Sequence, residues 1–178
     1  TAAERTIDLS ASYFVPDDLT RAALRAALER GVRVRIIVPG EHIDTEVVRK
    51  ASRAQWGELL EAGAEIHEFQ PTMFHCKMLI VDRLMVSVGS TNFDNRSFRL
   101  NDEANLNVYD DEFAARVSAV FEDDLERAHR ITFEAWNARM RSGSLLESVR
   151  GISRPARCAA RSWTSFRSAC ARLAGGFT

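Results

Sequence analysis

Short apolar segments alternate with helical segments along the chain, and this alternation constrains the fold more than any other feature. Residues 7–14 and 32–38 have the β-branched and aromatic content of strands, and a segment with helical spacing separates them. Asp17 and Asp18 can cap that helix, and Gly31 can end it. Two strands joined by one helix through short connections predict a parallel βαβ unit.

The alternation continues through the next 60 residues and beyond. The patterns predict a helix over 44–63, a strand over 64–69, a hairpin of 74–82 and 84–88 with its turn at Asp82-Arg83, a strand over 101–109 and a long helix from 110. In the strand over 101–109, Ala104, Leu106 and Val108 are expected to be buried. We therefore expect an α/β fold: an αβα sandwich around a mixed, mostly parallel sheet.

Charge divides the chain near residue 140. From residue 139 to the end there are eight arginines and one acid, a net charge of +7, whereas the remainder holds 16 basic and 24 acidic residues, a net charge of −8. We expect a catalytic domain over 1–140 and a basic Arg/Ser/Ala-rich tail over 141–178. The tail is either an amphipathic helix that lies on an anionic membrane or a disordered segment. The acidic body argues against a protein that coats duplex nucleic acid.

Cysteine usage gives no sign of a metal site. The three cysteines, Cys76, Cys158 and Cys170, have no metal-ligand or disulfide spacing. Cys76 follows His75 directly, but adjacent strand residues point to opposite faces, which disfavours joint ligation. We expect reduced thiols, no metal and no cofactor.

One short segment carries a pattern suited to phosphate chemistry. His75 and Lys77 are two residues apart, so on a strand both side chains point to the same side. An ammonium group can bind the phosphate oxygens of a phosphodiester, while an imidazole attacks phosphorus or protonates the leaving oxygen. Backbone N–H groups of Gly89 and Ser90 and the amide of Asn92 could add hydrogen bonds to the phosphate. Glu103 could hold the second nitrogen of the His75 imidazole.

His75-x-Lys77-x4-Asp82, followed by Gly89-Ser90-x-Asn92, resembles the HKD motif of the phospholipase D superfamily. The similarity continues through 13–17 and 87–103 and is greatest to the second half of bacterial cardiolipin synthases. It implies an αβα sandwich and a phosphohistidine intermediate. By the match of motifs, His75, Lys77 and Asp82 are the catalytic set, although Asp82 is mainly a structural partner. Lys77, Ser90 and Asn92 bind the phosphate, and Glu103 supports them.

The resemblance also implies two such motifs facing each other across a two-fold axis, and this chain has no second His-x-Lys. The second motif would come from another copy of the chain or from an absent N-terminal half. The favoured function is phosphatidyl transfer or phosphodiester cleavage on an anionic phospholipid such as phosphatidylglycerol, by a protein at the cytoplasmic face of the cell membrane. The alternatives are a metal-independent homodimeric nuclease, which the acidic body disfavours, and a non-catalytic half-domain that binds anionic phospholipid.

Overall fold

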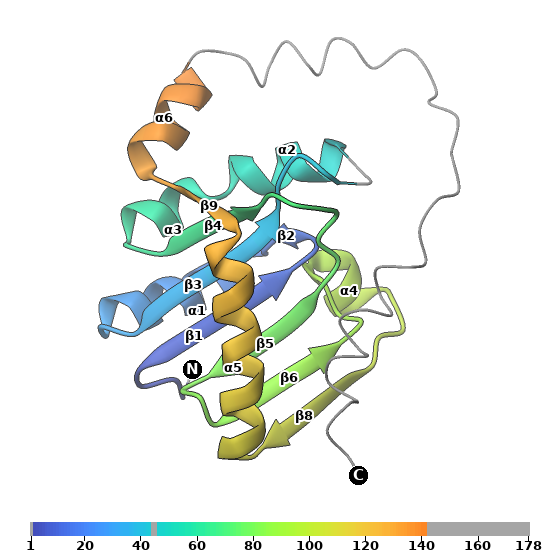
Figure 1. Cartoon of the computed structure of the whole chain (residues 1–178). Coiled ribbons are helices and arrows are strands. Elements are labelled where there is room, and N and C mark those ends of the chain that lie inside the picture. Colours follow the sequence, from blue (N-terminus) through green and yellow to red (C-terminus); the bar gives the residue numbers. More distant parts are fainter. Residues whose placement is uncertain (1, 44–45, 142–178) are drawn as a thin grey trace. The chain divides into compact units, whose positions relative to one another are not determined.

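A mixed sheet lies at the centre of the fold (Figure 1). The computed structural model describes residues 2–43 and 46–141, so the predicted tail helix lies outside the described residues. The seven strands of the sheet are β1 (Thr6–Ala11), β3 (Arg33–Pro39), β4 (Glu65–Phe69), β5 (Lys77–Val81), β6 (Met85–Gly89), β8 (Asn105–Tyr109) and β9 (Ala128–Ile131). Their spatial order is β8-β6-β5-β1-β3-β4-β9.

The connections between strands decide their directions. Strands β1, β3 and β4 pair in parallel, and helical connections join them in sequence. Strand β5 pairs antiparallel with both β1 and β6, and β8 and β9 also pair antiparallel with their neighbours. The sheet is mixed, as predicted. Parallel pairing is limited to β1, β3 and β4 rather than prevailing through the sheet, because a tight turn such as that between β5 and β6 can join only antiparallel neighbours.

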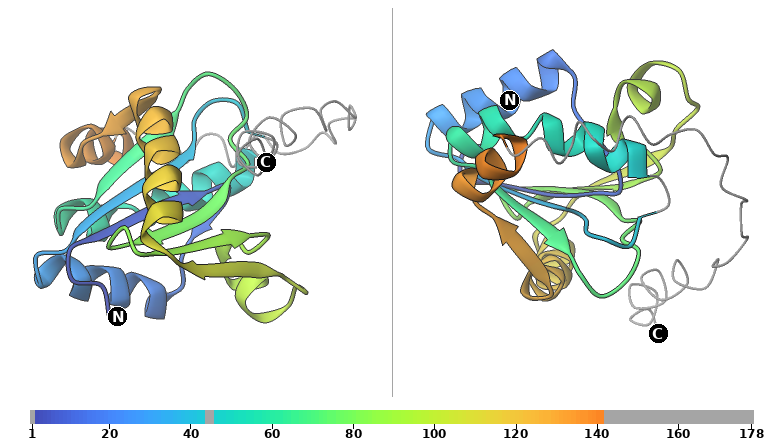
Figure 2. Two further views of the ribbon diagram at one scale, coloured as in Figure 1. Left: turned by 60° about the horizontal axis from the view of Figure 1, so that its bottom comes forward. Right: turned by 90° about the horizontal axis from the view of Figure 1, so that it is seen from above.

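Helices cover both faces of the sheet. Figure 2 shows α1 (Asp18–Glu29), α2 (Glu46–Ala54), α3 (Gly57–Glu61) and α6 (Phe133–Arg141) on one face and α5 (Asp111–Glu126) on the other. Each face has its own buried cluster: Val34 and Ile36 of β3 belong to the first, whereas Ile37 belongs to the second with Phe121 of α5. Successive residues of a strand therefore pack into two different cores, one on each face of the sheet. The predicted αβα sandwich is confirmed.

The predicted helix over 44–63 is wrong in one respect, because it consists of two helices with a break before Gly57. The indole Nε1 of Trp136 donates a hydrogen bond to the Arg53 carbonyl oxygen at 2.6 Å, the acceptor that a continuous helix would offer to the N–H of Gly57. A Cβ at Gly57 would lie 2.3 Å from the Trp136 ring. Packing of α6 thus ends α2, and no local pattern signals this.

A second small sheet adjoins the main one. Strand β2 (Phe14–Val15) follows β1, and β7 (Phe93–Asp94) follows β6; the two pair in parallel. The short helix α4 (Asn95–Arg99) comes next, with Asp94 as its N-cap. The small sheet thus ties the end of β1 to the chain that follows Ser90, a connection that the sequence analysis did not predict.

Candidate active site

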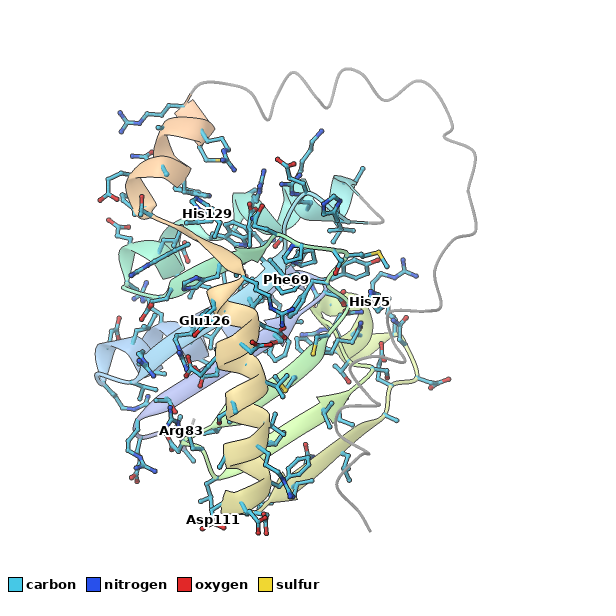
Figure 3. All side chains as sticks on the ribbon, viewed as in Figure 1. Phe69, His75, Arg83, Asp111, Glu126 and His129 are labelled. Atoms are coloured by element: carbon cyan, nitrogen blue, oxygen red, sulfur yellow. The ribbon has the colours of Figure 1, made fainter. Side chains whose placement is uncertain are left out.

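His75 lies in the loop that precedes β5, and its side chain is exposed. The predicted strand over 74–82 is therefore shorter, because pairing with β1 begins only at Ala11 and Lys77. Figure 3 shows His75 at the opposite end of β5 from Arg83. The Tyr13 ring lies edge-on to the imidazole, with ring centroids 6.3 Å apart and planes at 90°. A substrate can therefore reach the His75 imidazole from solvent.

Lys77 is the first residue of β5 and is half-buried. Its Nζ donates a hydrogen bond to the backbone carbonyl oxygen of His75 at 3.3 Å. The ammonium group therefore folds back over the loop that carries the histidine. The structure brings these two residues together as the motif predicts, although through the loop conformation and not through alternation along one strand.

Gly89 and Ser90 hold β6 close to the segment that leads into β8. A Cβ at Gly89 would lie 2.1 Å from the carbonyl oxygen of Ala104, so only glycine permits this approach. The Ser90 N–H donates to the Ala104 carbonyl oxygen at 3.0 Å, and the Ser90 hydroxyl accepts from the Ala104 N–H at 3.0 Å. The Ser90 N–H that the sequence analysis assigned to phosphate thus has a partner within the fold.

Glu103 lies next to Ser90 and near Lys77. It accepts hydrogen bonds from the Ser90 hydroxyl at 2.5 Å and from the Asn101 amide at 3.2 Å. These hydrogen bonds, foremost that of Ser90, lower the pKa of Glu103 below its usual range, and the positive charge of Lys77 adds to the effect. Glu103 is thus held ionised among the predicted site residues. Its support of the His75 imidazole stays a prediction.

Asn92 is oriented by a residue that the sequence analysis did not single out. Its side-chain oxygen Oδ1 accepts a hydrogen bond from the hydroxyl of Ser12 at 2.6 Å. Ser12 follows β1 and is buried, with 1% of its surface exposed. This hydrogen bond occupies the amide oxygen of Asn92. The amide nitrogen carries two N–H groups, which are the type of donor that can bind a phosphate oxygen.

Asp82 lies at the other end of β5 from Lys77. Asp82 is five positions after Lys77, which corresponds to roughly 16 Å along a strand at about 3.3 Å per residue. The Asp82 carboxylate accepts hydrogen bonds from the backbone N–H groups of Glu4 at 2.9 Å, Arg5 at 2.7 Å and Thr6 at 2.8 Å. This geometry gives Asp82 a role in the fold, as the resemblance implies. A part in the reaction stays a prediction.

The ionisation of Asp82 fits this role. Partial burial acts to raise the pKa of Asp82, but the backbone N–H donors of Thr6, Glu4 and Arg5 lower it, and the net direction is downward. Asp82 and Arg83 both have left-handed backbone conformations, with φ of 54° and 56°. Such a turn suits an antiparallel hairpin, and the predicted turn at Asp82-Arg83 is confirmed.

A small pocket of about 90 Å³ opens beside Lys77. Both apolar and polar side chains line this pocket. They belong to Lys77, Met78, Leu79, Ser87, Thr91, Phe93, Phe98 and Asn105. Phe98 of α4 stands edge-on to Phe93 with ring centroids 5.7 Å apart. The pocket thus places an apolar surface directly next to a cation, and the sequence analysis missed it because α4 was not predicted.

Two features common in other classes of protein are not found in the described residues. Within 2–43 and 46–141, no three His, Cys, Asp or Glu residues gather closely enough to hold a metal ion. None of the helices in this part of the chain has the length and apolar character needed to cross a membrane.

An αβα sandwich whose sheet presents a His-x-Lys pair at one end is an arrangement of the phospholipase D superfamily. The family model described as "Cardiolipin synthase, PLD-like domain" matches residues 1–125. The chain belongs to this family.

Curated relatives agree with this assignment. A cardiolipin synthase of Geobacillus sp. (strain WCH70) is 39% identical over 155 residues, covering 87% of this chain and 31% of the relative. Cardiolipin synthase A of Pseudomonas putida (strain GB-1) is 41% identical over 133 residues, covering 75% of this chain and 28% of the relative. The chain thus spans less than a third of the length of these relatives.

Solved structures share the fold. The Salmonella typhimurium phospholipase D family member Nuc superposes with a TM-score of 0.66 at 24% identity, covering 74% of this chain and 84% of that one. Phosphatidylserine synthase of Haemophilus influenzae gives a TM-score of 0.61 at 15% identity, covering 84% of this chain and 41% of the other. At these identities the likeness establishes the fold alone.

Proposed function

We propose that this chain provides one half of a phosphatidyltransferase site that acts on anionic phospholipid through a phosphohistidine intermediate. The observation that carries the proposal is the grouping of His75, Lys77 and Asn92 at one end of the sheet, in a chain of the cardiolipin synthase family. An exposed imidazole supplies the nucleophile. The ammonium group and the amide supply positive charge and hydrogen bonds for the phosphate oxygens.

The proposed reaction has two displacements at phosphorus. An imidazole nitrogen of His75 attacks the phosphorus of phosphatidylglycerol, a P–N bond forms, and the P–O bond to the glycerol headgroup breaks. The leaving oxygen takes a proton from an acid, and free glycerol departs. A hydroxyl of a second phosphatidylglycerol then attacks the phosphorus, loses its proton to the same group, and breaks the P–N bond to His75.

The acid in the first step must be a second group. A His75 imidazole bonded to phosphorus cannot protonate the leaving oxygen on the opposite, in-line side. We propose that a second histidine supplies this proton, from another copy of this chain or from a homologous half in a longer protein. The lengths of the curated relatives, of which this chain spans less than a third, favour the second source.

The pocket beside Lys77 supports a lipid over a nucleic acid. Leu79, Phe93 and Phe98 offer apolar surface within reach of the cation that would hold the phosphate. A volume of about 90 Å³ accepts only a few methylene groups, as the root of an acyl chain or the glycerol backbone would present. We place the protein at a membrane surface for the same reason.

Trapping of the phosphoenzyme tests the proposal. The chain, alone and together with a homologous first half, is incubated with phosphatidylglycerol labelled with ³²P in its phosphate. The mixture is then separated under alkaline denaturing conditions, which preserve phosphohistidine, and label is expected in the arm that supplies the second histidine. We expect label on the wild-type chain and none on His75→Asn. His129→Asn, which changes an exposed histidine on β9, is the matched control and should label fully. If His75→Asn is labelled as strongly as the wild type, the proposal fails.

Two further arms separate the alternatives. Unlabelled single-stranded DNA that suppresses labelling more strongly than unlabelled phosphatidylglycerol would favour the nuclease. Binding to phosphatidylglycerol vesicles without any label, also after addition of a homologous first half, would favour the non-catalytic reading. Chelation by EDTA should leave the labelling unchanged, because the proposed charge stabilisation uses Lys77 and Asn92.

A further inference from the structure

Ser12, directly after β1, contacts Asn92 although the two residues are 80 positions apart in the sequence. We propose that Ser12 is a positioning residue that acts through Asn92 and aims the amide N–H groups of Asn92 at the phosphate. The proposal rests on the proposed function of Asn92 as a phosphate ligand. The residue that follows β1 would then help to form the phosphate site, a role that the His-x-Lys segment alone does not predict.

The hydrogen bond is well placed to fix one orientation of the amide. The Ser12 hydroxyl donates to Asn92 Oδ1 at 2.6 Å, and Ser12 is 1% exposed, so water does not compete readily for it. An asparagine amide can rotate by half a turn and exchange its oxygen and nitrogen. A donor on the oxygen side selects the orientation in which the nitrogen faces away from Ser12.

The backbone around the bond restricts the remaining freedom. The N–H of Phe93, next to Asn92, donates to the Tyr13 carbonyl oxygen at 3.1 Å. Strands β2 and β7 then pair Phe14 with Phe93 and continue for one further residue. The main-chain segments that follow Ser12 and Asn92 are thus held together, and the side-chain rotation of Asn92 is the freedom that Ser12 removes.

The chain offers a matched control two residues earlier. Ser10 of β1 is fully buried, and its hydroxyl has no hydrogen-bond partner among the described residues. Alternation along β1 places Ser10 and Ser12 on the same side, but Ser10 lies inside the strand and does not reach Asn92. Loss of a buried serine hydroxyl as such can therefore be separated from loss of the contact to Asn92.

The test is a double-mutant cycle on the affinity of the full 178-residue chain for glycerol 3-phosphate, measured by NMR titration. Ser12→Ala should weaken binding about three- to tenfold, the range of one lost hydrogen bond between neutral groups. Ser12→Thr keeps the hydroxyl and should restore binding. Ser10→Ala should match the wild type. With Asn92→Ala already present, Ser12→Ala should add less than a twofold loss.

Additive losses would overturn the proposal, since Ser12 would then act independently of Asn92. The side-chain amide resonances of Asn92, recorded without ligand, give a second readout. They should move toward the values of a free amide in Ser12→Ala and stay in place in Ser12→Thr and Ser10→Ala. If glycerol 3-phosphate fails to bind the wild type, the proposed phosphate site fails. The resonances still decide the positioning, and unchanged resonances in Ser12→Ala would contradict it.

Discussion

The two ends of strand β5 carry the two parts of one sequence motif, and they have opposite environments. At the start of β5, Lys77 lies over the exposed His75 loop and near the ionised Glu103. At the far end, the Asp82 carboxylate accepts hydrogen bonds from the three backbone N–H groups of residues 4–6. The first end thus brings charged side chains from separate segments close together, whereas the charge at the second end is held by the backbone of residues 4–6.

The spacing of a sequence motif can thus reflect the length of a strand. The five residues of β5, Lys77–Val81, fill the interval from the lysine of the motif to its aspartate, so Asp82 lies at the other end of the strand. A carboxylate with three N–H donors stabilises the folded chain, whereas an exposed imidazole contributes little to it. Substitutions at the two ends should therefore separate activity from stability.

The largest expected effect is on turnover at His75. In the assembly that is active, His75→Asn should reduce phosphatidyl transfer by about 10²–10⁴-fold, because the positioned nucleophile is lost. The free energy of unfolding should change by less than about 0.5 kcal/mol, since the side chain is exposed. Cardiolipin formation and urea unfolding measure the two quantities. A folded variant with most of its activity would remove His75 from the site.

The next effect is on stability at Asp82. Asp82→Ala leaves three backbone N–H groups without their acceptor and should lower the free energy of unfolding by about 2 kcal/mol. Asp123→Asn is the control, because Asp123 makes an exposed ion pair with Arg127 on α5, and such pairs contribute less than about 1 kcal/mol. Urea titration at pH 7 compares them. Equal losses of unfolding free energy in the two variants would show that the three N–H donors stabilise the fold no more than an exposed ion pair does.

Acid should weaken the same anchor. The folded-state pKa of Asp82 is lowered, so its stabilisation is present above the unfolded pKa near 3.9 and is lost as the pH falls through the folded value. The stability difference between wild type and Asp82→Asn should therefore be constant from pH 7 to about pH 5 and shrink below about pH 4. A difference that does not depend on pH would exclude ionisation of Asp82 as its source.

The smallest effect is expected at Glu103. Glu103→Gln removes a negative charge near Lys77 and should raise the affinity for glycerol 3-phosphate about two- to threefold at low salt. The increase should disappear at high ionic strength, because exposed charges are screened. Titrations at two salt concentrations test this. A lower affinity in Glu103→Gln would mean that Glu103 orients Ser90 or Lys77 more than it opposes the anion.

Local patterns were sufficient for much of the fold. Alternation and capping residues placed α1, β3 and the hairpin of β5 and β6, and Asp17 caps α1 as expected. The long helix predicted from 110 begins there, with Asp110 as its cap, whereas the strand predicted over 7–14 is divided into β1 and β2. The prediction that Ala104 and Leu106 are buried is wrong: Ala104 precedes β8 and is exposed, and Leu106 is 62% exposed because β8 is an edge strand. Val108 is half-buried. Alternation shows that a strand has two faces, but not whether a helix covers either face.

Tertiary contacts account for what could not be predicted. Arg35 of β3 is buried, and its guanidinium forms hydrogen bonds with Asp8 at 2.7 Å and Glu122 at 2.9 Å. The alternating patterns of β1 and β3 do not predict that Asp8 of one strand and Arg35 of the other form a buried ion pair. Ser12 similarly reaches Asn92 across 80 positions of sequence. The motif predicts His75 and Lys77, but neither the Ser12–Asn92 contact nor the Arg35 ion pairs could be predicted from it.

The central claim is that the start of β5 binds the ligand and its end stabilises the fold, and one paired measurement tests it most directly. Lys77→Met, which keeps the aliphatic stem, and Asp82→Ala are each assayed for glycerol 3-phosphate affinity and for urea unfolding. We predict that Lys77→Met loses about tenfold or more in affinity with stability within about 0.5 kcal/mol of wild type, and that Asp82→Ala loses about 2 kcal/mol with affinity within about twofold. Parallel losses of affinity and stability in both variants would contradict the division.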